Sequence, residues 1–456
     1  MSFKDKSVLV IGMGISGISA INYLHSEGAK VSVFDTKKEK ELDKSLESLE
    51  GIPAKYFLAR KTMDLSGIDL VVKSPGVPPY AKIIKDAREK GIEIISDIEL
   101  AYRVSASKNI IAITGSNGKT TTSYMVGDTF LKGNLPSFLV GNVGVGILGK
   151  IKEVRKDDIL VVESSSFQLE DTINFKPKVS LILNISPDHL DWHGSYEDYI
   201  NAKKKIFKNQ DKDDYTVLNY DDKITRKFSK EVSSKLIWFS TNTKLDKGIY
   251  LEDNNIIINI DEKIRLMSVG DLKVIGKHNL ENVLGSIGIF YAMGLDIKII
   301  KEGLSGFKGV EHRLEYVGEK RKRKFYNDSK GTNPDASIKA IAAIDGPIIL
   351  LAGGYDKNSD FGDFIESFGS KVKSLILFGD TREEIRKTAL KFGFTNNYIV
   401  ENMKEAVTLA YDLSHEGDNI LLSPACASWG MYRNFEERGK DFKNEVVNLG
   451  EEWNGK

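Results

Sequence analysis

Cysteine is nearly absent from this sequence of 456 residues, and Cys426 is the only one. An intrachain disulfide is therefore excluded, and a metal site built from cysteines is disfavoured. This usage fits a reducing compartment. Neither sign of charge is in excess, because Lys+Arg and Asp+Glu both total 65. Without a bulk electric field to attract nucleic acid or an anionic membrane, local groups must hold any anionic substrate.

Long apolar runs are also missing. No run approaches the ~20 residues that span a bilayer, and residues 1–6 lack the charged-then-apolar layout of a signal peptide. We therefore expect a cytoplasmic protein with no membrane partner and no nucleic-acid partner. Hydrophobic content of 41% and charged content of 29% describe an ordinary globular chain.

The length predicts about three domains at the usual ~150 residues per domain. Short β-branched runs alternate with amphipathic helical stretches, a pattern typical of α/β domains with parallel sheets and crossover helices. We place boundaries near Asp97 and Gly309, which gives domains at 1–97, 98–309 and 310–456.

Individual elements follow from the same pattern. Buried strands are expected at residues 8–11, 31–34, 70–72, 109–113, 159–162, 179–183, 324–326, 348–351, 375–378 and 419–422. Helices are expected at residues 18–27 and 279–293. Between residues 215 and 274 many short strands with turn signals predict a mixed or antiparallel extension of the central sheet.

The first glycine motif lies between the first strand and the first helix. Residues 12–17 read GMGISG, and Asp35 closes the following strand. Glycines in this pattern let the backbone approach a pyrophosphate, whose charge the helix N-terminus attracts. The motif indicates a nucleotide with a diphosphate but not which nucleotide, and a tight structural turn is the alternative.

A second glycine motif, residues 114–121 (TGSNGKTT), follows the strand at 109–113 and precedes a helix. Ile113 stands where a full Walker A motif has its first glycine. Backbone amides can still cradle phosphates, Lys119 can neutralise them, and Thr120 offers a hydroxyl to magnesium. This motif indicates ATP.

Polar residues then follow several strands of the central domain. Glu163 ends the strand at 159–162, Asn142 lies in a glycine loop, and His189 follows the strand at 179–183 within DHLD. A carboxylate at a strand end beside a phosphate loop is where a magnesium ligand belongs. We predict a metal site at this edge of the sheet, although a histidine there could also be a surface residue.

Three consecutive lysines occur in a helical stretch at residues 199–207. Helical spacing surrounds Lys203 with apolar-bodied neighbours, whereas Lys205 has polar ones and faces water. An inward lysine has its ammonium form disfavoured and its amine made reactive. Extension of the Lys203 side chain to solvent is the alternative.

Polar loops also gather in the third domain and before the last central helix. Asn282 lies in GKHNLEN at residues 276–282, and Arg313 follows Glu311-His312. Residues 327–334 (NDSKGTNP), 353–357 (GGYDK) and 423–428 (SPACAS) each follow a strand. Because ligands bind outside the carboxyl ends of parallel strands, these loops predict a substrate site.

Taken together, these motifs resemble the Mur ligases, the cytoplasmic enzymes that build the peptide of peptidoglycan. The resemblance covers all three domains in order. ESSSFQL at 163–169, NDSKGTN at 327–333, and 423–428 followed by NFE at 434–436 resemble the D-glutamate-adding member. The Asp-Asn-Pro-Arg signature of the diamino-acid-adding member does not occur. The resemblance implies a Rossmann-like N-terminal domain, a central P-loop ATPase-like domain with a mixed sheet, and a C-terminal Rossmann-like α/β domain.

The resemblance also assigns ligands to residues. It implies that the first domain binds the UDP of the substrate, with Lys37 standing where the family often has arginine. The implied UDP-substrate residues are Ile15, Ser16, Asp35, Thr36, Lys37, Ser74, Pro75, Gly76, Asn142 and Ser165. The implied ATP residues are Gly115, Ser116, Asn117, Gly118, Lys119, Thr120, Thr121, Asn282, Arg313 and Asp328. The implied D-glutamate residues are Thr332, Lys357, Ser428 and Phe435. The implied catalytic residues are Lys119, Glu163, His189 and Lys203, with Thr120, Glu163, His189 and carbamylated Lys203 as ligands of two magnesium ions.

The implied reaction is an ATP-dependent acid–amino-acid ligation in peptidoglycan precursor synthesis. UDP-N-acetylmuramoyl-L-alanine would be activated as an acyl phosphate and joined to D-glutamate, and the enzyme is expected to be a monomer. The sequence does not identify the base for the amine. Three alternatives remain open: a folylpolyglutamate-type ligase, an NAD-dependent oxidoreductase resting on residues 12–17 alone, and a non-catalytic nucleotide-binding regulator.

Overall fold

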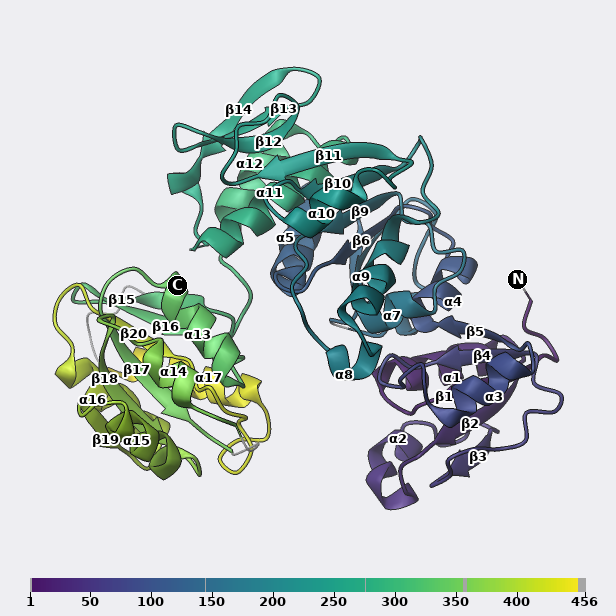
Figure 1. Cartoon of the computed structure of the whole chain (residues 1–456), viewed down its shortest axis with the longest axis horizontal. Coiled ribbons are helices and arrows are strands. Elements are labelled where there is room, and N and C mark those ends of the chain that lie inside the picture. Colours follow the sequence, from purple (N-terminus) through teal and green to yellow (C-terminus); the bar gives the residue numbers. More distant parts are fainter. Residues whose placement is uncertain (1, 144, 275, 356–358, 450–456) are drawn as a thin grey trace. The chain divides into compact units, whose positions relative to one another are not determined.

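The computed structural model describes residues 2–143, 145–274, 276–355 and 359–449. The chain forms two compact units, one of residues 1–272 with 278–306, the other of residues 273–277 with 307–456 (Figure 1). Within these described ranges, the first unit contains two β-sheets and the second contains one. Among the described residues, no helix has the length and apolar character needed to cross a membrane.

The first sheet has five parallel strands in the order β3-β2-β1-β4-β5. Its strands are β1 (Ser7–Ile11), β2 (Lys30–Asp35), β3 (Lys55–Leu58), β4 (Leu70–Lys73) and β5 (Glu93–Ser96). Its helical segments are α1 (Ile15–Ser26), η1 (Glu39–Glu41), α2 (Asp43–Glu47), α3 (Lys82–Glu89) and α4 (Asp97–Val104). Alternate strand residues pack on opposite faces: Val8 and Val10 belong to the core that includes Leu24 of α1, whereas Leu9 belongs to the core that includes Ile84 of α3. Both faces are therefore covered, as a parallel sheet requires.

The central sheet has nine strands in the order β14-β13-β12-β11-β10-β9-β6-β8-β7. Its strands are β6 (Ile110–Thr114), β7 (Ser137–Gly141), β8 (Ile159–Glu163), β9 (Val179–Ile182), β10 (Tyr215–Asn219), β11 (Lys235–Ser240), β12 (Gly248–Glu252), β13 (Asn255–Asn259) and β14 (Lys263–Ser268). Strands β7 to β12 pair in parallel, and β12-β13-β14 pair antiparallel. The expected mixed extension after residue 215 is thus confirmed. Because β6 lies between β8 and β9, the loops after these three strands meet at one edge.

Ten helical segments of the described chain accompany the central sheet. They are α5 (Lys119–Lys132), α6 (Ile147–Lys150), α7 (Ser166–Glu170), α8 (Leu190–His193), α9 (Tyr196–Lys204), η2 (Lys205–Phe207), α10 (Lys223–Phe228), η3 (Val269–Asp271), α11 (Lys277–Ala292) and α12 (Ile297–Gly306). Two helices begin earlier than expected. Helix α1 begins at Ile15 and not at residue 18, because Gly14 serves as its N-cap. Helix α11 begins at Lys277, two residues before its expected start.

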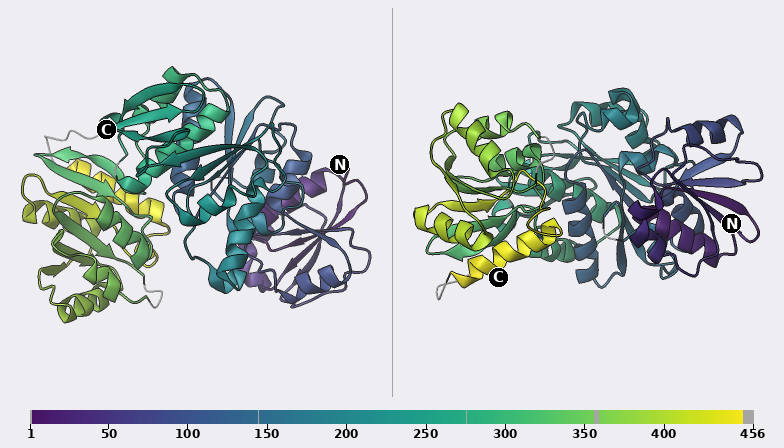
Figure 2. Two further views of the ribbon diagram at one scale, coloured as in Figure 1. Left: turned by 45° about the horizontal axis from the view of Figure 1, so that its top comes forward. Right: turned by 90° about the horizontal axis from the view of Figure 1, so that it is seen from below.

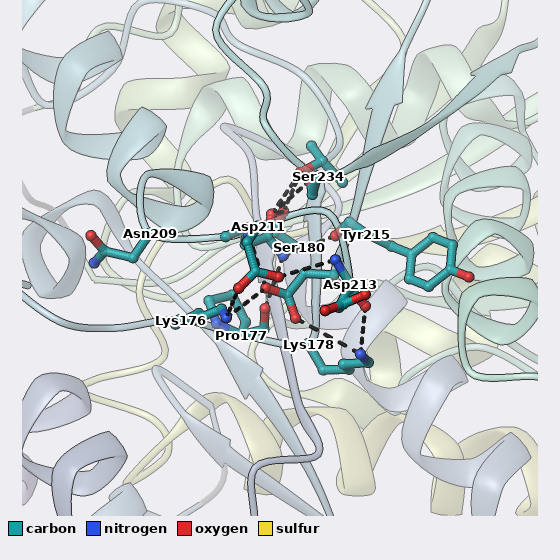
Figure 3. Close-up of polar contacts among 12 residues, drawn as sticks. Lys176, Pro177, Lys178, Ser180, Asn209, Asp211, Asp213, Tyr215 and Ser234 are labelled. Atoms are coloured by element: carbon teal, nitrogen blue, oxygen red, sulfur yellow. Dashed lines mark hydrogen bonds and ion pairs between the residues drawn. The ribbon is translucent and has the colours of Figure 1, made fainter.

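A buried glutamine, Gln210, connects the amino ends of β9, β10 and β11. Its partners Pro177, Ser180, Tyr215 and Ser234 are labelled in Figure 3. The Gln210 amide oxygen accepts hydrogen bonds from the hydroxyls of Ser180, Thr216 and Ser234. Its amide nitrogen donates to the carbonyls of Pro177 and Tyr215, each at 2.9 Å. With Gln210 only 4% exposed, these bonds satisfy a side chain that burial would otherwise penalise.

The sheet of the second unit has six strands in the order β15-β16-β20-β17-β18-β19, and only β15 is antiparallel. Its strands are β15 (Glu315–Lys320), β16 (Arg323–Asn327), β17 (Ile348–Gly353), β18 (Val372–Phe378), β19 (Asn397–Ile399) and β20 (Asn419–Leu422). Its helices are α13 (Pro334–Ala343), α14 (Gly362–Glu366), α15 (Arg382–Lys391), α16 (Met403–Leu413) and α17 (Phe435–Asn448). One face packs on α13, α14 and α15, and the other on α16 and α17, so the sheet lies between helical layers (Figure 2).

Candidate active site

A cavity of about 790 Å³ lies at the carboxyl ends of β1, β2 and β4. Nine of the ten residues predicted to contact the UDP substrate line it: Ile15, Ser16, Asp35, Thr36, Lys37, Ser74, Pro75, Gly76 and Asn142. Ser165 is the exception, because its hydroxyl instead caps α7 through the amide of Gln168. The cavity is therefore bordered by the glycine motif of the first domain, by the loop after β7 and by Gln168 of α7.

Close backbone approach shapes the wall formed by the glycine motif. Gly12 has a φ of +92°, and a Cβ on Gly17 would lie 1.9 Å from the Gly12 carbonyl oxygen. The Asp35 carboxylate accepts hydrogen bonds from the amides of Met13 and Lys37, both at 2.9 Å. The N-cap of α1 is Gly14, which offers no side-chain cap. The first turn of α1 therefore has backbone amides that no side chain caps and that can donate hydrogen bonds to an anion.

The second glycine motif forms a loop between β6 and α5. Gly118 caps α5 with a φ of +85°, in the left-handed region that favours glycine. The Lys119 ammonium donates to the carbonyls of Gly115 and Ser116, at 2.7 and 3.0 Å. A Cβ on Gly118 would lie 2.1 Å from the amide oxygen of Asn282. The fold thus brings Asn282, predicted from a motif far along the chain, to the phosphate loop.

Glu163 ends β8 beside this loop and is 1% exposed. Asn142 donates to one Glu163 carboxylate oxygen at 2.9 Å, whereas the other oxygen has no hydrogen-bond partner. A buried carboxylate oxygen without a partner is costly unless a cation approaches it. Glu163 therefore fits a magnesium ligand, together with the hydroxyl of Thr120 at the start of α5. Among the described residues, no three His, Cys, Asp or Glu side chains form a metal-binding group by themselves, so other oxygens would have to complete the coordination.

Lys203 points inward from α9, and its side chain is 1% exposed. Its ammonium donates to the Gly115 carbonyl at 2.8 Å and to the Thr114 hydroxyl at 3.2 Å, both in the phosphate loop. Burial, with a smaller contribution from nearby Lys119, holds the pKa of Lys203 well below its usual range. The inward face predicted from helical spacing is confirmed. Lys205, expected to face water, is instead partly buried in an ion pair with Glu170.

His189 lies at the same edge and caps α8 with a φ of +51°. Its ring packs against Phe167, with ring centroids 4.8 Å apart, and lies 3.5 Å from a carboxylate oxygen of Asp188. His193 lies one helical turn further, where burial lowers its pKa to about 4, and it hydrogen-bonds Ser166 at 2.9 Å. His189 has its side chain 52% exposed, so its ring remains accessible to a ligand.

In the second unit, three loops and the start of α17 meet at the carboxyl ends of β16, β17 and β20. The Ser329 hydroxyl donates to the Phe435 carbonyl at 2.8 Å, and the amide of Tyr355 donates to the Ala427 carbonyl at 2.9 Å. The buried Arg438 guanidinium donates to the carbonyls of Ser329 and Cys426.

These contacts gather the loops that carry the predicted C-terminal ligand residues. Asp328, Thr332, Ser428 and Phe435 lie on them. Burial raises the pKa of Asp328, and Arg313 lies near enough to oppose that rise. Lys357, also predicted to bind D-glutamate, lies outside the described residues.

Sequence reasoning missed several residues that line the cavity. Gln168 lies within the ESSSFQL motif but was not singled out, and Lys61 and Lys82 belong to no motif. The spacing of Gln168 from Glu163 is the one signal that could have found it, because α7 begins directly after the loop of β8. The two lysines reach the cavity only through the fold.

The sequence matches family models in all three domains. The MurD-like N-terminal domain of Mur ligases matches residues 6–96, the Mur ligase middle domain residues 113–290, and the Mur ligase glutamate ligase domain residues 312–426. A UDP-N-acetylmuramoylalanine–D-glutamate ligase of Alkaliphilus oremlandii is 48% identical, covering 98% of this chain and 100% of its own. The enzyme of the same name from Clostridioides difficile is 46% identical with the same coverage.

Solved structures agree at the level of the fold. A UDP-N-acetylmuramate–alanine ligase from Thermotoga maritima superposes with a TM-score of 0.57 at 22% identity, covering 98% of this chain and all of its own. A MurF ligase from the same organism, in complex with ADP, has a TM-score of 0.56 at 19% identity, covering 98% of this chain and 96% of its own. The predicted three-domain α/β fold is confirmed, whereas the boundaries at Asp97 and Gly309 stay predictions. The chain belongs to the Mur ligase family.

Proposed function

We propose that this chain joins D-glutamate to UDP-N-acetylmuramoyl-L-alanine with consumption of ATP, in the synthesis of the peptidoglycan precursor. Relatives at 42–48% identity along the whole chain carry the name of this ligase. The N-terminal cavity supplies a place for the UDP portion, and the third-domain loops supply candidate contacts to the amino acid. The expected cytoplasmic location and monomeric state belong to this proposal.

The observation that carries the proposal is the convergence of three groups on one loop of the central sheet. Lys119 and Lys203 both donate to the Gly115 carbonyl, and the unpartnered carboxylate oxygen of Glu163 lies on the adjacent strand. An oxidoreductase has no need of a phosphate loop with a cation-seeking carboxylate, and a non-catalytic regulator has no need of the buried Lys203.

The reaction divides into two steps with balanced atoms. The alanyl carboxylate oxygen attacks the γ-phosphorus of ATP, which forms an acyl phosphate and releases ADP. The amine of D-glutamate then attacks the acyl carbon, an amide bond forms, and inorganic phosphate leaves with loss of a proton. Lys119 offsets phosphate charge during the first step. Water must be excluded between the steps, because it would hydrolyse the acyl phosphate.

The metal ligands proposed are the Thr120 hydroxyl and Glu163 for one magnesium ion, with His189 and carbamylated Lys203 for a second. Magnesium supplies charge neutralisation between two anionic reactants. The lowered pKa of Lys203 supports carbamylation, because only the neutral amine captures carbon dioxide. Its position beside Glu163 and the phosphate loop would turn the resulting carbamate into an anionic ligand.

Phosphate release from ATP in the presence of UDP-N-acetylmuramoyl-L-alanine tests the proposal. We expect release to depend on D-glutamate and to be near background with L-glutamate, L-alanine or a diamino acid. Dependence on another amino acid would reject the specific assignment. Turnover without binding of the UDP substrate would favour a folylpolyglutamate-type ligase, and hydride transfer without ATP would favour an oxidoreductase.

Lys203→Ala tests the proposed metal ligand separately. We expect the variant to lose activity and a short carboxylic acid to restore part of it, because the acid can replace the missing carbamate oxygens. Lys204→Ala is the matched control, since Lys204 is on the same helix but pairs with Glu231. Near-normal activity of unrescued Lys203→Ala would remove Lys203 from the mechanism.

A further inference from the structure

Asp97 is a buried carboxylate that joins two walls of the N-terminal cavity. It begins α4 and is 2% exposed. The Ser16 hydroxyl, from α1, donates to one carboxylate oxygen at 2.7 Å. The side-chain amide of Gln168, from α7, donates to both oxygens at 3.1 and 3.2 Å. Ser16 and Gln168 both line the cavity, whereas Asp97 does not appear among its lining residues.

The orientation of Gln168 is fixed from its other end. Its amide oxygen accepts hydrogen bonds from the backbone amide and the hydroxyl of Ser165, at 3.2 and 3.3 Å. The amide nitrogen must therefore point at Asp97, because a rotated amide would lose the bond from the Ser165 backbone amide and would set an oxygen against the carboxylate. Asp97 thus supports the same α7 turn that follows Glu163 in the chain.

No cation forms an ion pair with Asp97 in the part of the chain that the structure describes. Ser16, Gln168 and the Ile98 amide are the donors that face it. Burial raises the pKa of Asp97, and these hydrogen bonds oppose that rise. A buried carboxylate held only by neutral donors is costly for the fold. A binding site can require this unfavourable burial, because one acceptor then fixes the positions of two donor side chains, Ser16 and Gln168.

We propose that Asp97 is a positioning residue for the UDP-substrate site, which holds Ser16 and Gln168 at the spacing that the substrate requires. This inference rests on the proposed function of the cavity. Asp97 acts through its two neighbours and does not itself contact the substrate. The effect of losing it should therefore appear in the KM for the UDP substrate, because neither Ser16 nor Gln168 belongs to the phosphate loop.

Asp97→Asn is the first test. The new amide would place one N–H group against the N–H groups of Gln168, while the hydroxyl of Ser16 can rotate to keep a partner. We expect the KM for UDP-N-acetylmuramoyl-L-alanine to rise at least tenfold. The KM values for ATP and D-glutamate should change less than twofold. Isothermal titration with the UDP substrate should show the same loss of affinity in the absence of ATP.

A double-mutant cycle with Gln168→Ala is the decisive test. Asp97→Asn should raise the KM for the UDP substrate less than threefold when Gln168 is already replaced by alanine, because the partner through which Asp97 acts is then absent. A residue that merely stabilises the fold would raise the KM by the same factor in both backgrounds.

Glu99→Gln provides the matched control. Glu99 is on the same helix, is fully buried, and accepts hydrogen bonds from the amides of Ile173, Asn174 and Phe175. None of these three residues lines the cavity. We expect Glu99→Gln to lower the melting temperature while the KM for the UDP substrate stays within twofold.

The outcomes separate this inference from the proposed function. A wild-type protein that neither binds the UDP substrate nor turns it over would refute the proposed function. With an active wild-type protein, an unchanged KM in Asp97→Asn would refute the inference. An equal rise in all three KM values, or the same rise from Asp97→Asn in the Gln168→Ala background as in the wild-type background, would also overturn it. Should Asp97→Asn fail to fold, Asp97→Glu, which keeps the carboxylate but displaces it by one methylene group, replaces it in the cycle.

Discussion

We expect Asp328 to make the stability of the second unit depend on pH. Its carboxylate is 8% exposed and accepts hydrogen bonds from the Ser423 hydroxyl at 2.7 Å and from the Leu314 amide at 3.1 Å. Burial raises the pKa of Asp328 from its ordinary value of 3.8 to about 7, although these hydrogen bonds and Arg313 oppose the rise. The folded chain therefore holds a proton at pH 5 that the unfolded chain has released.

The sign and size of the effect follow from proton linkage. Between the unfolded and folded pKa values the native state binds more protons, so its stability falls as pH rises through this window and becomes constant above it. A folded pKa near 7 predicts a loss of roughly 2.5 kcal/mol between pH 5 and pH 7.5 from this group alone. Asp328→Asn cannot titrate, so the variant should lack this part of the pH dependence. Changes in hydrogen bonding would shift its stability equally at both pH values.

Hydrogen exchange of slowly exchanging amides in β17 and β20 gives the local unfolding free energy of this unit, corrected for the intrinsic pH dependence of exchange. We expect the wild-type value to fall from pH 5 to pH 7.5 by roughly 2.5 kcal/mol more than the Asp328→Asn value. Equal changes in the two proteins, or a wild-type unit that gains stability relative to the variant, would refute the assigned pKa and its cause.

Three further substitutions test the packing described above. Gly118→Ala should raise the KM for ATP on the order of tenfold, measured by phosphate release, because the new Cβ meets Asn282 at a left-handed backbone position. Gln210→Leu should lower the free energy of unfolding, measured in urea, by about 2–4 kcal/mol, because buried hydroxyls and carbonyls lose their hydrogen bonds to Gln210. Gly439→Ala should cost about 1–3 kcal/mol in the same assay, because its Cβ would lie 2.2 Å from the ring of His312.

Local patterns were enough to predict much of the fold. The runs of β-branched residues located the core strands within one to three residues, because strands buried on both faces read as continuous apolar segments. Helix beginnings were predicted less accurately. Helix α1 begins before its expected start, because a glycine at the N-cap does not mark in the sequence where the loop ends and the helix begins. Helical spacing indicated the inward direction of Lys203, because neighbours three and four residues apart share one face. It left extension to solvent as the alternative, and only the burial of Lys203 in the folded chain decided between them.

Only the tertiary structure revealed how the site is held together. Asp97 lies 81 residues from Ser16 and 71 residues from Gln168, and no local period connects positions so far apart. The unpartnered oxygen of Glu163 likewise depends on which strands become neighbours.

The sequence by itself determined the types of chemical group available: two glycine loops, a carboxylate at a strand end and a lysine with apolar helical neighbours. These depend on short-range backbone preferences and on spacing within one element. The folded chain decided which groups meet, which carboxylate is buried and which pKa values shift. Desolvation and hydrogen bonding arise from neighbours that are distant in the sequence, and only the packing of the sheets brings them together.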